Sequence, residues 1–463
     1  MSDKTRFHFT GICGTAMGAV AAAMKQRGFT VTGSDAGVYP PMSDFLRREG
    51  ITLSEGYRED NIPADTDVVI IGNAISRGNP EAEAALERKL LYQSLPEVLK
   101  EFFLRGKRNL VVSGTHGKTT TASMLAWLLR QAGRDPGFVI GGLPNNLGCG
   151  AHFAQSAFNV LEGDEYDSAF FDKRSKFLHY LPECVIINNI EFDHADIYNS
   201  LDEIKLSFRR LLNIVPRGGR AFINGDDASC LEVAAGAPCP VTSVGFAGTC
   251  DLRLGNLNYE TDRSSFTLDG VAYSLRMTGE FNVRNAAMAV AAAGFAGLDA
   301  AEIRAGLEGF DGVARRQELR GEVNGIRVID DFAHHPTAIR LAVQSLRQRY
   351  PGARVWVLFE PRSNTTRRAV FQTELAEALA TAEFAIVSAI HDSHKLPAND
   401  RLDPIRLAAE ITRHGGQGWY MTGIDEIVSH VTAAARPGDV IAVLTNGGFG
   451  GIHQKLLTAL EPE

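Results

Sequence analysis

Residues 114–120, with the sequence Gly-Thr-His-Gly-Lys-Thr-Thr, combine glycine, lysine and hydroxyl groups as a triphosphate-binding loop does. Glycines let the backbone fold closely around an anion with its N–H groups pointing inward, and a following helix N-terminus adds partial positive charge. In such a loop Lys118 reaches the β- and γ-phosphates, and the hydroxyl of Thr119 or Thr120 binds Mg²⁺. Val112 replaces the first glycine of the common G-x-x-x-x-G-K-[ST] motif, and a structural turn with an exposed lysine is the alternative. We expect ATP and Mg²⁺ here, with the nucleotide held by Gly114, Thr115, His116, Gly117, Lys118, Thr119 and Thr120.

Carboxylates and a histidine follow two apolar runs downstream of this loop. The segment 162–165, Glu-Gly-Asp-Glu, comes directly after the run 158–161, and Asp193 and His194 follow the run 185–188. The carboxyl ends of parallel strands form the usual ligand edge of a sheet. Mg²⁺ prefers oxygen ligands beside phosphate, so the acidic segment predicts a magnesium site, with a solvated acidic turn as the alternative. His194 could hold a second metal ion or orient a carboxylate.

Charged residues further along the chain could complete a nucleotide site. Arg316, next to Arg315, could clamp a phosphate between domains, although a solvated linker charge fits its position equally well. The segment 330–336, which contains Asp331 and His334, closes another apolar run and could contact nucleotide or metal, or form a capped turn. The glycine-rich segment 446–453 fits either a binding loop or a mobile surface loop.

A second glycine-rich turn lies near the N-terminus. Gly11, Gly14 and Gly18 follow the first apolar run with the spacing G-x-x-G-x-x-x-G, which departs from the dinucleotide pattern G-x-G-x-x-G. Asp35 ends the next predicted strand, where a carboxylate can bond a ribose. We interpret the turn as a diphosphate site, and it does not distinguish NAD from a UDP-sugar.

The elements that position these residues form three α/β blocks. A chain of 463 residues is too long for one hydrophobic core. Strand-like runs alternate with helical stretches, the pattern of parallel sheets. The predicted helices include 81–91, one from about 119 to Gly133, and 285–296. The predicted domains span 1–105, 106–316 and 317–463. The predicted strands lie at 7–10, 31–32, 68–72, 110–113, 158–161, 185–188, 221–223, 327–329, 355–359, 385–387 and 440–444, with shorter ones within 251–277.

Composition excludes several functional classes. The net charge of −8 argues against nucleic-acid binding, which needs a basic face. No run approaches the ~20 apolar residues of a membrane span, and the N-terminus leaves no room for a signal peptide. The six cysteines lack metal-ligand spacing, so we expect reduced thiols and a cytoplasmic location.

Taken together, these motifs resemble the Mur ligases, which build and recycle the peptide of bacterial cell-wall precursors. The resemblance covers essentially the whole chain, and residues 114–120 match the family's G-T-x-G-K-[ST]-T loop. Further matches are 162–165, 188–194, 279–285, Arg316 and 331–334. The turn 11–18 is similar to that of the branch whose first domain binds UDP. Within that branch, this chain resembles the members that recycle peptide in five segments: 72–80, 164–167, 170–177, 359–365 and 446–453.

The resemblance implies a three-domain α/β fold: a Rossmann-like UDP-binding domain, a central P-loop ATPase-type ligase domain and a C-terminal Rossmann-like domain. It implies that ATP phosphorylates the lactyl carboxylate of UDP-N-acetylmuramate. The amino group of L-alanyl-γ-D-glutamyl-meso-diaminopimelate then attacks this acyl phosphate, in cell-wall peptide recycling. No covalent protein nucleophile is needed, because the physical demand is to neutralise the transferring phosphoryl group.

The resemblance also implies roles for residues. The catalytic groups are Lys118, Glu165, His194 and Arg316. The nucleotide contacts beyond the phosphate loop are Asn285, Arg316, Asp331 and His334. The metal ligands are Thr119, Glu162, Glu165 and His194. The substrate contacts are Gly11, Gly14, Thr15, Asp35, Arg174, Lys176 and Arg362. For the last three, the alternative is an ordinary charged side chain exposed to solvent. We expect a monomer or weak homodimer.

Two departures and three alternatives remain. Phe281 stands where the family often has histidine, and no lysine aligns with the carbamylated lysine of other members. The nearest alternative is the activity that adds L-alanine to the same acceptor. A nicotinamide-dependent oxidoreductase would use the first glycine turn but leaves the phosphate loop unexplained. A non-catalytic nucleotide-binding switch would bind ATP without forming an amide.

Overall fold

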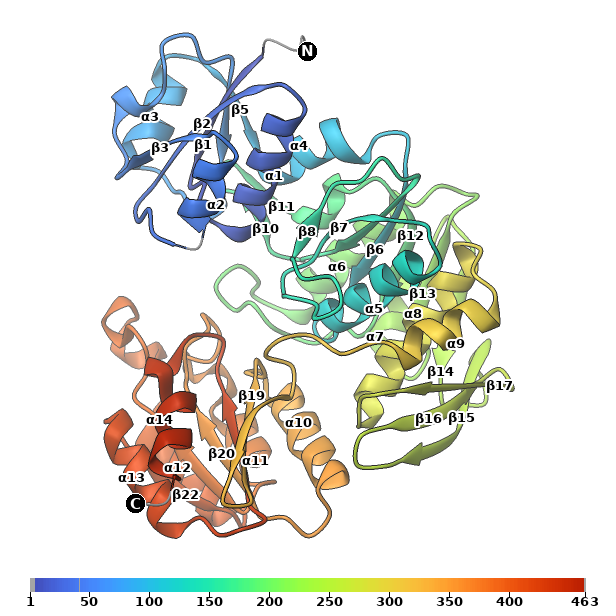
Figure 1. Ribbon diagram of the computed structural model, residues 1–463, viewed down its shortest axis with the longest axis vertical. Coiled ribbons are helices and arrows are strands. Elements are labelled where there is room, and N and C mark those ends of the chain that lie inside the picture. Colours follow the sequence, from blue (N-terminus) through green and yellow to red (C-terminus); the bar gives the residue numbers. More distant parts are fainter. Residues whose placement is uncertain (1–4, 41, 462–463) are drawn as a thin grey trace.

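The computed structural model describes residues 5–40 and 42–461, which form three α/β units that follow one another along the chain (Figure 1). The first unit is a five-stranded parallel sheet of order β3-β2-β1-β4-β5. Its strands are β1 (Arg6–Thr10), β2 (Thr30–Asp35), β3 (Thr52–Glu55), β4 (Val68–Ile71) and β5 (Leu91–Ser94). Its helices are α1 (Thr15–Gln26), α2 (Met42–Arg48), α3 (Pro80–Glu87) and α4 (Leu95–Leu99). This is the predicted Rossmann-like arrangement, and it places the 11–18 turn at the carboxyl end of β1.

The helix predicted over 81–91 is shorter than expected. It ends at Glu87, and Lys89 adopts a left-handed backbone with a φ of 54°. Leu91 then begins β5, where it pairs in parallel with Val68. Charged residues at helical spacing continue past the true end, so the pattern alone did not show where the helix gives way to an edge strand.

The middle unit is a ten-stranded sheet of order β17-β16-β15-β14-β13-β12-β6-β9-β7-β8. Its central strands β14, β13, β12, β6, β9 and β7 pair in parallel, and β15, β16 and β17 form an antiparallel extension. The strands are β6 (Arg108–Ser113), β7 (Gly137–Val139), β8 (Ala151–His152), β9 (Phe158–Glu162), β12 (Pro182–Ile187), β13 (Arg220–Asn224), β14 (Val241–Gly245), β15 (Leu252–Tyr259), β16 (Ser264–Leu268) and β17 (Val271–Leu275). A separate hairpin pairs β10 (Asp167–Ala169) with β11 (Asp172–Ser175).

Four helices accompany this sheet: α5 (Lys118–Gln131), α6 (Leu201–Asn213), α7 (Ala228–Ala234) and α8 (Glu280–Phe295), and α9 (Ala300–Glu308) follows them. Helix α5 begins at Lys118, within the phosphate loop, and its Leu125 and Leu128 are fully buried in a core shared with the alanine-rich α8. Burying each such leucine contributes about 1.5–3 kcal/mol. Helix α8 begins at Glu280, five residues before the predicted start and directly after Gly279, whose backbone is not helical. The helix that carries the phosphate loop is therefore anchored along its length.

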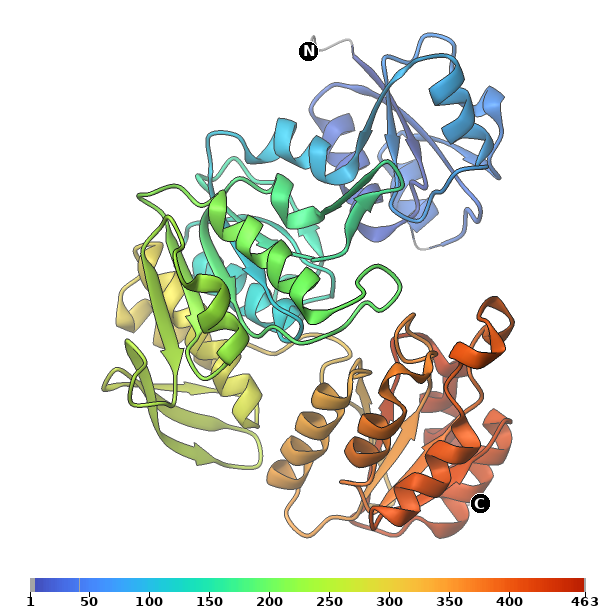
Figure 2. The ribbon, with the colours of Figure 1, turned by 180° about the vertical axis from the view of Figure 1, so that it is seen from behind.

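The C-terminal unit is a six-stranded sheet of order β18-β19-β23-β20-β21-β22 (Figure 2). All neighbours pair in parallel except β18 (Glu318–Val323), an antiparallel edge strand that the sequence did not predict. The other strands are β19 (Ile326–Asp331), β20 (Val355–Phe359), β21 (Phe384–Val387), β22 (Gln417–Tyr420) and β23 (Val440–Leu444). The helices are α10 (Pro336–Arg349), α11 (Gln372–Leu379), α12 (Pro404–Arg413), α13 (Ile424–Ala434) and α14 (Ile452–Ala459).

The segment between β12 and α6 extends from the middle unit towards the C-terminal unit (Figure 2). Asp193 in this segment accepts a hydrogen bond from the Thr365 hydroxyl at 2.8 Å, and Asp196 accepts one from the Asn364 amide at 2.8 Å. These polar contacts hold the two units together in the structure. The predicted three-domain α/β fold is confirmed, whereas the boundaries near 105 and 316 stay a prediction. In the described part of the chain, no helix is long and apolar enough to cross a membrane.

Candidate active site

A cavity of about 790 Å³ lies where the three units meet. Thr15 of the first unit, Lys118 of the middle unit and Asp331 of the C-terminal unit all line it. The loops that surround it follow the carboxyl ends of β1, β6 and β19, which is where open α/β sheets bind ligands. Twelve of the predicted site residues share this wall with the three just named: Gly14, Thr115, His116, Gly117, Thr119, Thr120, Glu162, Lys176, His194, Asn285, Arg316 and His334.

The phosphate loop is shaped by two glycines in left-handed conformations. Gly114 has a φ of 125°, and a Cβ there would lie 2.9 Å from the backbone nitrogen of Asn188. Gly117 has a φ of 79°, and a Cβ there would lie 2.3 Å from the Asn285 side-chain oxygen. Side chains at either position would strain the backbone and collide with neighbours. The glycines therefore serve both the backbone conformation and the close approach to Asn188 and Asn285.

Lys118 is folded inward in the structure. Its Nζ donates to the Gly114 carbonyl at 2.7 Å and pairs with Glu165 Oε2 at 2.8 Å. Burial disfavours the charged amine, but Glu165 and Asp164 outweigh burial and raise the pKa of Lys118. The same ammonium could move to a nucleotide phosphate, since both partners are anions. Glu165 thus acts as a local counter-ion for this lysine.

The four predicted metal ligands divide into two groups. The Thr119 hydroxyl donates to Glu162 Oε1 at 2.8 Å, and the Gly141 N–H donates to Glu162 Oε2 at 2.6 Å. Glu165 Oε1 instead lies 3.0 Å from His194 Nε2, and Asp164 offers a third ligand atom within 4.8 Å of theirs. Oxygen-rich groups of this kind suit Mg²⁺. The donor chemistry fits the expected ion at either place.

Electrostatics around Glu165 keep it ionised. Burial raises the pKa of Glu165, yet the charge of Lys118 and the hydrogen bond from His194 more than offset this and lower it. Burial likewise lowers the pKa of His194, but Glu165 and Asp193 raise it above its ordinary value. His194 has a left-handed backbone with a φ of 55°, and the hydrogen bond of 3.0 Å to Glu165 Oε1 holds its ring beside the carboxylate.

The linker before β18 brings Arg316 to the phosphate loop. Arg316 Nη2 donates to the Thr119 hydroxyl at 3.3 Å, and burial lowers the pKa of this guanidinium. Asp331 accepts hydrogen bonds from the backbone N–H groups of Gln317 and Ala333 at 2.9 and 2.7 Å. Burial raises the pKa of Asp331. Arg316 therefore reaches the phosphate loop from the linker between the middle and C-terminal units, and its role as a phosphate clamp stays a prediction.

The first glycine turn faces the same cavity only in part. Gly14 and Thr15 line it, but Gly11 sits behind them, with its N–H donating to the Ser34 carbonyl at 2.9 Å. Asp35 accepts a hydrogen bond from the Cys13 N–H at 2.8 Å. Asp35 therefore holds the turn in shape in this structure.

The three basic residues predicted to bind substrate differ in position. Lys176 lines the cavity and pairs with Asp164 at 2.6 Å. Arg174 pairs with Asp172 on the β10–β11 hairpin, and Arg362 packs against Gly447 in the C-terminal unit. Neither arginine belongs to the wall of the cavity described above, so their substrate role stays a prediction.

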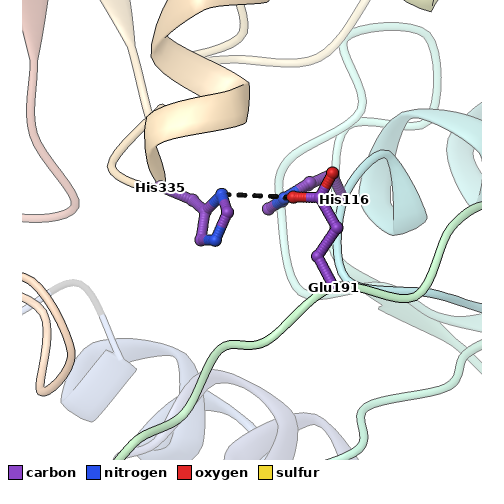
Figure 3. Close-up of side chains that lie close together, drawn as sticks. All are labelled: His116, Glu191 and His335. Carbon is purple, nitrogen blue, oxygen red and sulfur yellow. Dashed lines mark hydrogen bonds and ion pairs between the residues drawn. The ribbon is translucent and has the colours of Figure 1, made fainter. Parts of the chain in front are cut away.

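The sequence did not predict that His116, Glu191 and His335 form one cluster. Figure 3 shows His335, directly before α10, pointing toward Glu191 and His116 of the middle unit. Each residue lies within a segment that the sequence singled out, but their contact joins separate units. No local spacing in the sequence could have revealed it.

Three family models match the chain in succession. They are the Mur ligase family catalytic domain over residues 6–107, the Mur ligase middle domain over 112–293, and the Mur ligase glutamate ligase domain over 315–447. The chain belongs to the Mur ligase family. This Mur ligase is 44% identical over 466 residues to the UDP-N-acetylmuramate–L-alanyl-γ-D-glutamyl-meso-2,6-diaminoheptandioate ligase of Escherichia coli K12, with 98% of each chain covered.

Two further relatives help to place this Mur ligase within the family. The UDP-N-acetylmuramate–L-alanine ligase of Desulforapulum autotrophicum is 32% identical, with 98% of each chain covered. The crystal structure of a murein peptide ligase from Psychrobacter arcticus is 35% identical, with a TM-score of 0.72 and 99% of each chain covered. The resemblance inferred from the motifs is confirmed, and the nicotinamide-dependent alternative has no support from these relatives.

Proposed function

We propose that this Mur ligase joins the lactyl carboxylate of UDP-N-acetylmuramate to the amino group of L-alanyl-γ-D-glutamyl-meso-diaminopimelate, with ATP converted to ADP and phosphate. The observation that carries this is the full-length 44% identity to the E. coli ligase named for that tripeptide. Identity to the L-alanine ligase is 32% over a similar length. The tripeptide is therefore the preferred amine, in the recycling of cell-wall peptide, and we propose the cytoplasm as the compartment.

Phosphoryl transfer sets the main electrostatic demand. Negative charge is spread over the transferring group, and fixed cations nearby stabilise it. Lys118 would exchange Glu165 for a nucleotide phosphate, while Arg316 already touches the Thr119 hydroxyl beside the loop. The carboxylate of UDP-N-acetylmuramate attacks the γ-phosphoryl group and ADP leaves. The amine then attacks the acyl phosphate and phosphate leaves, so no protein nucleophile is required.

Other residues would hold and orient the nucleotide. We propose contacts from the backbone N–H groups of residues 114–120 to its phosphates, and from Asn285, Asp331 and His334 around them. These three line the cavity from α8 and from the loop after β19. Because the loop and its helix are fixed by packing, little reorganisation is needed when the phosphates arrive.

Thr119 with Glu162 would hold Mg²⁺ beside the phosphates, and Glu165 with His194 would hold a second ion. Bound Mg²⁺ supplies positive charge to the phosphate oxygens. Before nucleotide arrives, the chain's own residues satisfy these carboxylates: Thr119 and the Gly141 N–H bond Glu162, and Lys118 pairs with Glu165. Both carboxylates are therefore correctly placed for a cation, and Lys118 and His194 keep Glu165 ionised.

UDP-N-acetylmuramate would enter from the first unit. We propose that Gly14 and Thr15 contact its diphosphate, with Gly11 and Asp35 fixing the turn from behind. Lys176 lies on the cavity wall and is the basic residue best placed for the acceptor's carboxylate. Arg174 and Arg362 remain proposals for anionic parts of the peptide.

The test offers the purified protein UDP-N-acetylmuramate, ATP and Mg²⁺ with either the tripeptide or L-alanine. We expect UDP-N-acetylmuramoyl-tripeptide with one ADP formed per product. Product formed with L-alanine but not with the tripeptide would refute this proposal and identify the protein as the alanine-adding ligase. ATP binding without either amide would make the protein a nucleotide-binding switch.

A further inference from the structure

Two histidines and one glutamate converge between the middle and C-terminal units, apart from the residues assigned to Mg²⁺. His116 Nε2 lies 3.1 Å from Glu191 Oε2, and His335 Nδ1 lies 3.4 Å from the same oxygen (Figure 3). These three ligand atoms all lie within 4.8 Å of one another. Tetrahedral coordination with bonds of about 2.0–2.2 Å places neighbouring ligand atoms about 3.4 Å apart. The side chains already have the spacing that one ion requires.

We propose that His116, Glu191 and His335 form a binding site for one divalent transition-metal ion, such as Zn²⁺ or Co²⁺, that bridges the middle and C-terminal units. Two imidazoles with one carboxylate leave a fourth position for water or a substrate oxygen. Imidazole nitrogen favours Zn²⁺, Co²⁺ and Ni²⁺, whereas Mg²⁺ prefers oxygen. The site is therefore chemically distinct from the Thr119–Glu162 group.

The protonation states suit a metal. A histidine must be neutral and a carboxylate ionised to bind an ion. Burial and the neighbouring His116 lower the pKa of His335 to about 4. Burial alone raises the pKa of Glu191, but its hydrogen bond with His116, together with smaller contributions from its other neighbours, outweighs burial, and the pKa is lowered to about 2. At neutral pH both side chains are in the form that a metal ion binds.

Surrounding groups orient His335 of the C-terminal unit and Glu191 of the middle unit. His335 Nε2 donates to the Phe192 carbonyl at 3.1 Å, which fixes the tautomer and leaves the Nδ1 lone pair free to accept. Nδ1 currently accepts the Thr337 N–H at 3.2 Å, so an ion would replace this helix-capping bond. Glu191 is held at its backbone, where its N–H donates to the Thr115 hydroxyl at 2.9 Å. Such second contacts are typical of built metal sites.

The local charge also favours a cation. Within residues 5–40 and 42–461, the ion-pair partners of Glu191 are His116 and His335. The other histidine-containing cluster, Asp164 with Glu165 and His194, is already paired with Lys118 and Lys176. An ion at the first cluster displaces no ammonium group. Its occupancy would tie the phosphate loop, through His116, to α10 of the C-terminal unit.

The experiment titrates Co²⁺ into the full-length, nucleotide-free protein in excess Mg²⁺, and follows the visible absorption of the bound ion. The inference does not depend on the ligase reaction, because no substrate is present. We expect one Co²⁺ per chain, with Zn²⁺ displacing it. His335→Asn keeps a helix-capping side chain, and Glu191→Gln keeps the shape of the glutamate. Each should weaken Co²⁺ binding at least ~100-fold, since losing even an outer contact of a metal ligand costs 10–100-fold.

Two control variants locate the ion. His194→Ala removes the histidine of the acidic cluster, and His152→Ala removes a histidine whose side chain is 39% exposed. Both should keep stoichiometric Co²⁺ binding. Three results would each overturn the proposal: no bound Co²⁺ in the unmodified protein, unchanged affinity in both His335→Asn and Glu191→Gln, or loss of binding in His194→Ala alone. Circular dichroism of each variant shows whether it is folded.

Discussion

The contact between Thr365 and Asp193 gives the sharpest test of how the middle and C-terminal units cooperate. The Thr365 hydroxyl donates to Asp193 Oδ1 at 2.8 Å and accepts the Ala195 N–H at 3.4 Å. Both side chains are almost fully buried, at 3% and 5% exposed. Thr365→Val removes the hydroxyl with nearly no change in shape. The substitution therefore probes the bond between units more than the packing.

The size of the effect follows from the charge of the acceptor. Burial raises the pKa of Asp193, but His194 and His334 more than offset this and lower it, so the acceptor is a carboxylate. A hydrogen bond to a charged group contributes about 1.5–3 kcal/mol. Losing this hydrogen bond would reduce the equilibrium constant for docking of the two units roughly 10- to 100-fold. If docking assembles the site, kcat/KM for ligation should fall by at least about 10-fold.

Thr366→Val is the matched control. Thr366 is 1% exposed, and its hydroxyl bonds Ser363 at 2.8 Å within the C-terminal unit. Steady-state ligation kinetics and solution scattering are measured on both variants. We expect Thr365→Val to lower kcat/KM and increase the radius of gyration, and Thr366→Val to change neither by a comparable amount. Equal kinetics for the two variants would refute the role of this contact.

Three further predictions concern the phosphate loop and acid stability. Lys118→Met should lower kcat by about 10²–10³-fold, because one charge-stabilising donor is lost, with a normal circular dichroism spectrum; near-normal turnover would contradict this. Gly114→Ala should weaken ATP binding and lower Tm, since its φ is 125° and the new Cβ would lie 2.9 Å from the Asn188 nitrogen. Calorimetry measures both the affinity for ATP and Tm, and unchanged values would show that the loop is not constrained at this residue. Burial raises the pKa of Asp172, but Arg174 and His179 lower it to about 2, below the unfolded value of about 3.9. Its contribution to the free energy of unfolding, roughly 2 kcal/mol, is present above pH ~3.9 and lost as pH falls towards about 2. In Asp172→Asn the free energy of unfolding should therefore fall less steeply with decreasing pH in that range. A slope equal to that of the unmodified protein would argue against the ion pairs.

Local chemistry explains which features the sequence could predict. The phosphate loop needs a strand, two glycines and a helix start in succession, so residues 114–120 were identifiable from spacing alone. Strand ends such as Glu162 and Asp331 were also predictable, because parallel sheets gather them at one edge. The family resemblance then supplied the order of the three domains. Each of these inferences depends on contacts within a short stretch of chain or on a repeated motif.

Contacts between units explain what the sequence could not predict. His335 meets Glu191 only because α10 docks beside the segment after β12, and no pattern near either residue encodes that docking. The edge strand β18 alternates weakly in burial, so its pairing with β19 depends on tertiary structure. Asp35 has the expected position at the end of β2, yet it bonds the Cys13 N–H. Side-chain direction at such ends is decided by neighbours distant in the chain.

The central claim is that ATP activates the lactyl carboxylate as an acyl phosphate in the cavity between the units. UDP-N-acetylmuramate labelled with ¹⁸O in that carboxylate is incubated with ATP, Mg²⁺ and the tripeptide, and the released phosphate is analysed by mass spectrometry. Attack of the carboxylate on the γ-phosphoryl group transfers one labelled oxygen to phosphate for each amide formed. We expect phosphate with one ¹⁸O in step with UDP-N-acetylmuramoyl-tripeptide. Amide formation with unlabelled phosphate, or ATP hydrolysis without amide, would contradict the proposed mechanism.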